Sequence, residues 1–292
     1  MPTPRTGTLY VCATPIGNLE DISLRALRVL READLIAAED TRRTRKLCAH
    51  YDIHTPLTSY HQHSPPAKAQ SLLQQLLAGK GIALVADAGL PGISDPGHDL
   101  VVLAIEQHVP IVVVPGPSVV MSALVLSGLP TGSFRFEGFL PRRRADRQAL
   151  LERLSTDTRT LVFFEAPHRL LHTLADMRQC LGDRRVAVVR ELTKLHEQVL
   201  RCSLSEALAH FQADRPRGEF TLVVAGGQPL PEAAPSRAEV KEALSKLLAQ
   251  GLSTRDAVRR VARRYGLPRR EVYAAAHEPP GEDASQDVSP SG

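Results

Sequence analysis

Residues 81–97 constrain the fold most strongly, because a short apolar run passes there directly into a loop rich in glycine and proline. Residues 82–86 are apolar without interruption, which is typical of a strand buried on both faces. Residues 89–97 contain three glycines and two prolines, so they form neither a helix nor a strand. Open α/β sheets bind ligands at the carboxyl ends of their strands. The stretch therefore predicts a buried strand that ends at a ligand-binding loop.

The same plan recurs along the chain and predicts two α/β domains. Residues 111–114 form another apolar run, and the loop PGPS follows at 115–118. Both loops have an alternative interpretation as ordinary strand-to-helix turns. Strands alternate with amphipathic helices, which favours a mostly parallel sheet in the first domain. The segment GLPTG at 128–132 interrupts this alternation. We therefore expect an N-terminal α/β domain at 1–128 and a C-terminal α/β domain at 129–229.

The C-terminal residues differ in charge from the rest of the chain, whose net charge is +4 over 292 residues. Residues 236–270 carry ten Lys or Arg against three Asp or Glu. Helical spacing of apolar residues predicts a basic helical module at 236–277, either a helix-turn-helix or a small bundle packed on the body. Such a module suggests a polyanionic partner. Residues 278–292 are rich in Pro, Ser and acidic residues, and we expect them to be disordered.

Several classes of protein are disfavoured by composition and by missing motifs. No apolar run approaches the roughly 20 residues that cross a bilayer, and the first residues form no signal core, so we expect a cytoplasmic protein without membrane contact. The four cysteines form no CxxC pair, and His61 and His63 have no acidic or Cys neighbour, so no metal is expected. GxGxxG, GxxxxGK[ST] and GxSxG motifs are missing, which weakens dehydrogenase, P-loop and hydrolase assignments.

Polar residues with catalytic potential follow the predicted strands. Residues 39–42 (EDTR) come directly after the apolar run 35–38. At such a position Asp40 can accept a proton and Arg42 can hold a phosphate; the alternative is that Asp40 only caps a helix. His61 is a second candidate base, because imidazole titrates near neutral pH.

Eight motifs stand in order along the chain: TPIGNL at 14–19, AEDTR at 38–42, SYH at 59–61, DAGLPGISDPG at 87–97, PGPS at 115–118, EGFLP at 137–141, PHRLL at 167–171 and RELTK at 190–194. Together they resemble the family of bacterial ribosomal RNA small subunit methyltransferase I, within the tetrapyrrole methylase superfamily. The resemblance runs from about residue 8 to residue 226, and the basic tail is similar to the family's C-terminal extension.

The resemblance implies a homodimer that uses S-adenosylmethionine to methylate the 2′-oxygen of a cytidine ribose in 16S rRNA, near the decoding centre and within the 30S subunit. It also implies two α/β domains of the tetrapyrrole methylase type with a cofactor cleft between them. The cofactor contacts carried over from the family are Asp87, Ala88, Gly89, Ile93, Pro115, Gly116, Pro117, Ser118, Ala123, Phe164, Glu165, Leu192 and Thr221.

In this family context Asp40 and His61 are the candidate bases and Arg42 is a phosphate clamp. The expected RNA contacts are Arg42, Arg142, Arg143, Arg259, Arg260, Arg263 and Arg264. For the run at 142–144 and for Arg147, the alternative is a solvated charged surface.

Two other functions stay open. A precorrin-type tetrapyrrole C-methyltransferase shares the fold, but its substrate is small and needs no basic appendage. A non-catalytic RNA-binding protein on the same fold would bind no cofactor and would tolerate Asp40→Ala.

Overall fold

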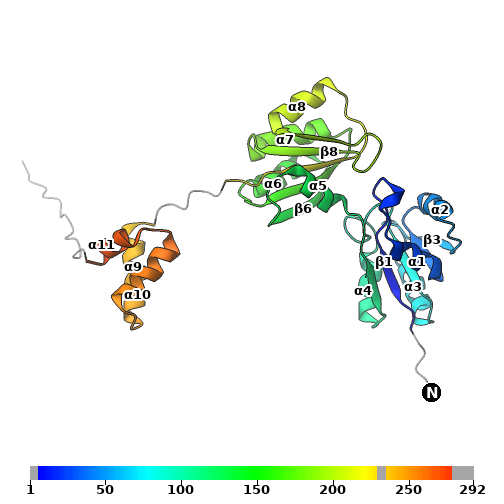
Figure 1. Cartoon of the computed structure of the whole chain (residues 1–292), viewed down its shortest axis with the longest axis horizontal. Coiled ribbons are helices and arrows are strands. Elements are labelled where there is room, and N and C mark those ends of the chain that lie inside the picture. The colour runs from blue at the N-terminus through cyan, green and yellow to red at the C-terminus, as the bar shows by residue number, and fades with distance from the viewer. Residues whose placement is uncertain (1–5, 229–234, 278–292) are drawn as a thin grey trace, which may run out of the picture. The chain divides into compact units, whose positions relative to one another are not determined.

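The computed structural model describes residues 6–228 and 235–277 (Figure 1). The chain forms two compact units, Met1–Gln228 and Pro229–Gly292. Residues 278–292, which the sequence predicts to be disordered, lie outside the described residues. Among the described helices, none is both long enough and apolar enough to span a membrane.

The first sheet is entirely parallel, as the alternation of strands and helices predicted. Its strand order is β3-β2-β4-β1-β5. The central strand β4 is buried at every residue, which explains its uninterrupted apolar sequence. The strands are β1 (Leu9–Cys12), β2 (Leu35–Ala38), β3 (Leu57–Ser59), β4 (Ile82–Val85) and β5 (Ile111–Val114).

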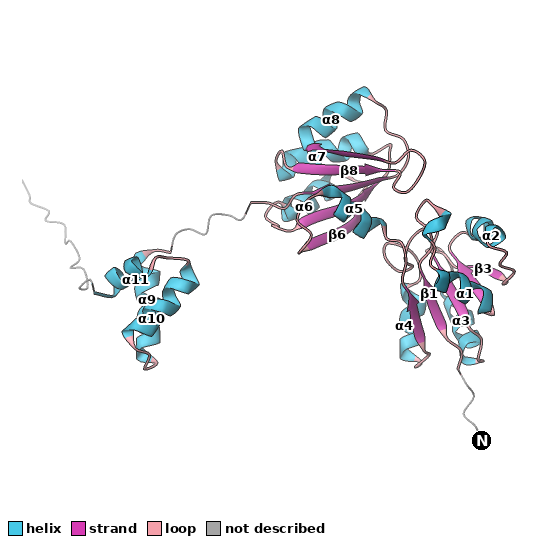
Figure 2. Cartoon of the chain, viewed as in Figure 1, coloured by secondary structure: helices cyan, strands magenta, loops and turns pink. Residues whose placement is uncertain are grey.

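Helices cover both faces of the first sheet (Figure 2). α1 (Leu24–Glu32) and α2 (Thr41–His50) share one hydrophobic cluster, and α3 (Pro66–Leu77) and α4 (His98–Glu106) share another. A short 3-10 turn, η1 (Leu19–Asp21), precedes α1. We call the first sheet with these helices the first lobe.

The second sheet is mixed, with strand order β6-β7-β10-β8-β9. Only β6 and β7 pair in parallel among its neighbours. α6 (Arg144–Leu154), α7 (Leu170–Leu181) and α8 (Leu204–Ala213) bury their apolar residues against one face. The strands are β6 (Phe134–Phe139), β7 (Thr160–Glu165), β8 (Arg185–Arg190), β9 (Gln198–Ser203) and β10 (Phe220–Val224).

α5 (Val119–Ser127) packs against the other face of the second sheet, on β8, β9 and β10 (Figure 1). The predicted boundary at residue 128 would place this helix with the first sheet, and the domain limits stay a prediction. Val120 and Ala123 of α5 share a hydrophobic cluster with Val162 of β7. The helix that leaves the last strand of the first sheet thus covers the second. We call the second sheet with α5–α8 the second lobe.

The second unit contains the three predicted helices, α9 (Arg237–Ala249), α10 (Thr254–Tyr265) and α11 (Arg269–His277). Ser253 caps the start of α10, and Gly266 ends it in the left-handed conformation with a φ of 65°. Both residues are the capping signals that the sequence displays. The apolar faces of the helices form a separate small core.

Candidate active site

The loops that follow β1, β4 and β5 meet at the carboxyl edge of the first sheet, because these parallel strands are neighbours. Thr14 and Gly89 exchange two backbone hydrogen bonds of 2.9 and 3.1 Å. A Cβ atom at Gly89 would lie 3.8 Å from the carbonyl oxygen of Pro117, and one at Gly116 would lie 3.0 Å from Cβ of Ala13. The two predicted ligand loops, 87–97 and 115–118, therefore lie side by side.

Several peptide groups in these loops have no partner within the described residues. The N–H groups of Ala88, Gly116 and Ser118 donate no hydrogen bond there, and Ala88 and Gly116 are exposed. The hydroxyl of Ser118 caps α5 by accepting a hydrogen bond from the N–H of Met121 at 3.4 Å. Main-chain groups, more than side chains, are thus left to hold a ligand.

The second lobe reaches the same edge of the first sheet. A Cβ atom at Gly17 would lie 2.7 Å from the carbonyl oxygen of Leu192 and 2.7 Å from Oγ1 of Thr193. Thr193 has a φ of 63°, and its buried Oγ1 makes no hydrogen bond within the described residues. Ile16 and Leu192 belong to one hydrophobic cluster. The loop after β1 and the loop after β8 are therefore in contact.

The predicted cofactor residues near this junction differ in how much surface they expose. Ala123, Leu192 and Thr221 are buried. Phe164 is half-buried, and Ile93 is exposed. A ligand at the junction would therefore meet Phe164 and Ile93, with the other three forming the packed layer behind.

The side chain of Glu165, another predicted cofactor contact, is buried and bound to neighbouring residues of the second lobe. Its carboxylate accepts hydrogen bonds from the hydroxyl of Thr173 and from the N–H of Ala166, and it lies 3.3 Å from Nε of Arg169. Only the backbone of Glu165 remains for contact with a ligand.

Two carboxylates fasten the ends of β2 and β4 to each other. Glu39 accepts a hydrogen bond from the N–H of Asp87 at 3.1 Å, and Asp87 accepts one from the N–H of Asp40 at 3.0 Å. The guanidinium of Arg43 lies 3.3 Å from the carboxylate of Asp87. The acids after β2 and β4 thus form one negatively charged edge next to the ligand loops.

Asp40 caps α2, which is the alternative that the sequence left open. It accepts a hydrogen bond of 2.8 Å from the N–H of Arg42 and pairs with the Arg42 guanidinium at 2.8 Å. The hydrogen bonds from Arg42 hold the pKa of Asp40 well below its usual range. Because such a carboxylate is a poor proton acceptor, this geometry weakens the prediction that Asp40 is the base.

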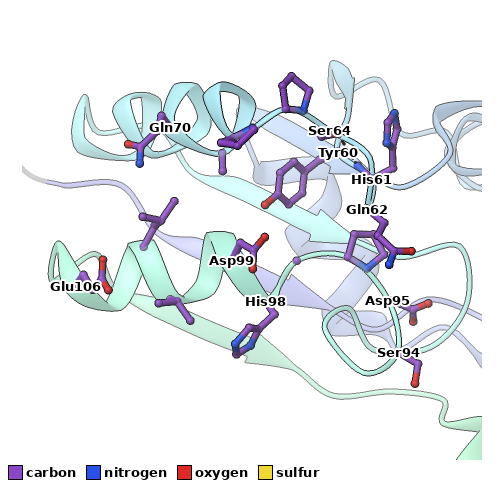
Figure 3. A pocket seen from close by; sticks show the side chains of 17 residues that line it. Tyr60, His61, Gln62, Ser64, Gln70, Ser94, Asp95, His98, Asp99 and Glu106 are labelled. Atoms are coloured by element: carbon purple, nitrogen blue, oxygen red, sulfur yellow. Dashed lines mark hydrogen bonds between the residues drawn. The ribbon is translucent and has the colours of Figure 1, made fainter. Parts of the chain in front are cut away.

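A pocket of about 860 Å³ opens between α3 and α4 (Figure 3). The segment after β3 contributes Tyr60, His61 and Gln62, and the segment leading into α4 contributes Ser94 and Asp95. Figure 3 shows Asp95 near Gln62, across the pocket from the helix that carries Gln70. His61, the second candidate base, is exposed at the rim.

Asp95 is a functional candidate that the sequence analysis missed. Burial, together with the nearby carboxylates of Glu39 and Asp87, raises the pKa of Asp95 to about 7. A general base works best when its pKa lies near the working pH. The sequence signal was its place in the same loop as Asp87, but its burial and the approach of Glu39 arise only from the fold.

The raised pKa predicts that Asp95→Asn stabilises the protein at pH 8 and not at pH 4. The folded state holds the proton of Asp95 up to a pH of about 7, whereas the unfolded chain releases it near 3.8. Stability is therefore lost as the pH rises between these values, and Asn, which does not ionise, keeps it. Because the side chain is partly exposed and water screens its charge, we expect a gain of only about 1 kcal/mol at pH 8, or roughly 2–4 °C in melting temperature. Calorimetry at both pH values measures it; an equal effect at both would contradict the assignment.

The predicted RNA-binding arginines are all on the surface. Arg42 and Arg143 each expose 84% of the side chain. On α10, the arginines lie opposite the buried face formed by Val258 and Val261. The four that the sequence predicted as RNA contacts, Arg259, Arg260, Arg263 and Arg264, are exposed, and so is Arg255.

Two comparisons identify the class of protein. The family Tetrapyrrole (Corrin/Porphyrin) Methylases matches residues 8–208, and the family RsmI C-terminal HTH domain matches residues 234–279. Uroporphyrin-III C-methyltransferase from Thermus thermophilus, complexed with S-adenyl homocysteine, has the same fold: the TM-score is 0.53 and the identity 19%, over 76% of this chain and 98% of that one. Diphthine synthase gives a TM-score of 0.57 at 14% identity, over 75% and 89%. Fold and loops together define a tetrapyrrole methylase.

Similar sequences show to which family within the tetrapyrrole methylases the chain belongs. The ribosomal RNA small subunit methyltransferase I of Synechocystis is 47% identical over 93% of this chain and 98% of its own. That of Bacillus subtilis is 42% identical over 93% and 94%. That of Thermotoga maritima is 48% identical over 75% and 99%. The chain therefore belongs to the ribosomal RNA small subunit methyltransferase I family, as its eight motifs predicted.

Proposed function

We propose that this protein transfers the methyl group of S-adenosylmethionine to the 2′-oxygen of a cytidine ribose in 16S rRNA, near the decoding centre. The proposal rests on the arrangement of groups at the carboxyl edge of the first sheet. There, ligand loops with free peptide groups lie beside a polar pocket that contains a carboxyl group with a pKa of about 7.

The residues at this edge fit the methyl donor. S-adenosylmethionine supplies a methyl group on a positively charged sulfur, ready for displacement by an oxygen nucleophile. Its positive charges suit a site edged by Glu39 and Asp87, and its polar groups suit the free N–H groups of Ala88 and Gly116. Phe164 of β7 and Ile93 of the loop 87–97 supply apolar surface. We place the donor between the two lobes, against these residues.

The protein contributes mainly position and proton transfer. The pocket between α3 and α4 orients the ribose so that its 2′-hydroxyl faces the methyl donor, and holding two reactants in line is a large part of the rate gain. Asp95 would take the proton of the hydroxyl as the C–O bond to the methyl group forms and the sulfur–methyl bond breaks, with S-adenosylhomocysteine as the leaving group. His61 contacts the nucleotide at the rim of the pocket, and Arg42, aligned by Asp40, holds a neighbouring phosphate. This displacement requires no metal ion.

The proposal extends to the assembly in which the protein works. We place it in the cytoplasm, where 30S subunits are, and propose that it acts there as a homodimer. Large apolar side chains that the two lobes leave exposed support the dimer: Ile105 on α4, Val113 on the edge strand β5, and Met121 and Val125 on α5. Sedimentation of the purified chain measures its oligomeric state.

Deleting the residues after Pro235 is expected to weaken RNA binding without changing the affinity for the methyl donor. The deleted helices carry the exposed arginines of α10 in a unit with its own core, so the first unit keeps its fold. Each lost phosphate contact lowers the slope of log affinity against log salt by about 0.7–0.9. RNA binding measured from low to high salt, for full-length and shortened chains, tests this; equal slopes would remove the module from RNA recognition.

Tritiated methyl transfer distinguishes the proposal from its two rivals. We expect label from S-adenosylmethionine to enter small ribosomal subunits and not a precorrin. Label in the precorrin would favour the tetrapyrrole C-methyltransferase. No transfer, together with no donor binding by calorimetry, would favour a non-catalytic RNA-binding protein.

A further inference from the structure

The second lobe has a hollow of its own, which we call the α6–α7 pocket. It has a volume of about 420 Å³. Arg142 precedes α6 and Arg147 lies in its first turn. His168 and Arg169 precede α7, and His172 lies in its first turn. All five lining residues are Arg or His, and none is acidic. A pocket with this lining selects an anion.

Two of the five side chains are fixed and form the floor of the pocket. Arg147 is buried, and its Nε lies 2.8 Å from the equally buried carboxylate of Asp176. It also donates to the carbonyl oxygens of Pro141 and Arg142, at 3.3 and 3.2 Å. These bonds anchor the chain just before α6, so the side chain of Arg142 starts from a rigid backbone.

Arg169, the second fixed side chain of the pocket, is also held by a buried carboxylate. Arg169 pairs with buried Glu165 and donates to the carbonyl oxygen of Leu140 at 2.7 Å. The two buried carboxylates, Asp176 and Glu165, thus neutralise the two fixed arginines. The charge of any further cation in the pocket is uncompensated.

Three side chains are left with nothing to bind. Arg142, His168 and His172 are exposed, and within the described residues their side chains make no hydrogen bond or ion pair. His168 lies in the turn that leads into α7 and His172 in the first turn of the helix, and both side chains line the pocket. No side chain caps the N-terminus of α7, and the helix dipole adds positive potential at this end.

We propose that the α6–α7 pocket binds a phosphodiester group of the RNA substrate, with Arg142, His168 and His172 as its ligands. A guanidinium donates two parallel hydrogen bonds to phosphate oxygens, and each imidazole donates another. The choice of RNA as the source of the phosphate rests on the proposed function.

The chain length of one relative supports a phosphate-binding site on the two lobes rather than only on the C-terminal helices. The Thermotoga maritima relative is matched over 99% of its length by 220 residues, whereas the first unit here spans Met1–Gln228. A chain of that size has room for the two lobes but not for three further helices. Binding of ribosomal RNA by such a chain requires basic sites on the lobes.

The test compares a triple variant, Arg142→Gln with His168→Gln and His172→Gln, with the control Arg178→Gln. Arg178 is exposed in the last turn of α7 and does not line the pocket. We expect the triple variant to bind small-subunit RNA at least about tenfold more weakly at ~0.1 M salt, with a salt slope reduced by about 1. The control keeps wild-type affinity and slope. Wild-type RNA binding by the triple variant would overturn the proposal.

Three further measurements check the fold of the variant and separate this proposal from the proposed function. Unchanged affinity for S-adenosylmethionine shows that the triple variant is folded. If the wild-type chain transfers no methyl group but the triple variant still loses RNA affinity, the proposed activity fails and the phosphate site stands. Inorganic phosphate is then titrated against the imidazole NMR signals of His168 and His172. Saturable shifts combined with unchanged RNA affinity of the triple variant would assign the pocket to free phosphate and overturn RNA as its ligand.

Discussion

Asp95→Asn is expected to slow methyl transfer by about 10²- to 10⁴-fold and to leave the affinity for S-adenosylmethionine unchanged. Asn keeps the shape of the side chain but cannot accept the proton of the 2′-hydroxyl. Asp95 lines the pocket between α3 and α4, whereas the main-chain groups proposed to hold the donor belong to residues 88 and 116. Single-turnover transfer to small subunits measures the chemical step without product release.

The pH dependence of the same step gives a sharper criterion. Because burial and the carboxylates of Glu39 and Asp87 raise the pKa of Asp95 to about 7, the base is protonated and inactive at acid pH. The wild-type rate should therefore rise about tenfold per pH unit up to about 7 and then level off. Asp95→Asn should lose this rise.

Asp52→Asn is the matched control for this variant. Asp52 is a highly exposed aspartate of the first lobe, and among the described residues its side chain pairs only with His54 at the surface. Its replacement should leave both the rate and the pH profile as in the wild type. Retention of the wild-type profile by Asp95→Asn would show that Asp95 is not the base, and His61 would then be the next candidate.

Asp176→Asn is expected to lower the free energy of unfolding by about 3–5 kcal/mol. Asp176 and Arg147 are both buried, and Arg147 lies 2.6 Å from Asp176 through its terminal nitrogen. Removing the carboxylate leaves a buried guanidinium without a counter-charge, which costs far more than a surface pair is worth. Urea unfolding followed by circular dichroism measures the loss.

Two further variants test the cause of that loss. Asp146→Asn removes an exposed carboxylate, 3.8 Å from Arg143, and should change stability by no more than about 0.5 kcal/mol. Arg147→Met combined with Asp176→Leu removes both charges and should lose less than Asp176→Asn alone. A double variant less stable than the single one would mean that the side-chain shape matters more than the charge.

Individual strands, helix ends and loops could be predicted from the sequence, because the residues that determine each of them lie within a few positions of it. The apolar run at 82–86 gives β4, and Ser253 and Gly266 give the two ends of α10. The glycines and prolines at 89–97 and 115–118 likewise give the two loops that meet at the edge of the first sheet. In each case the cause of the structure is near in the chain.

What the sequence could not provide depends on partners far along the chain. α5 is apolar on every side, so its periodicity does not say which sheet it covers. Arg147 belongs to a basic run with the pattern of a solvated surface. In the structure its side chain is buried and donates a hydrogen bond to the carboxylate of Asp176, 29 residues away. The pKa of Asp95 is raised first by burial and then by the carboxylates of Glu39 and Asp87, and both the burial and the approach of Glu39 arise only in the folded chain.

The most direct test of the central claim is mass spectrometry of the nucleosides of 16S rRNA after methylation by the purified protein. Small subunits from cells lacking the protein are incubated with the chain and S-adenosylmethionine, and the rRNA is digested to nucleosides. The proposed function predicts one new 2′-O-methylcytidine, which Asp95→Asn fails to produce within the same time. A methyl group on a base, or no new methylated nucleoside at all, would contradict it.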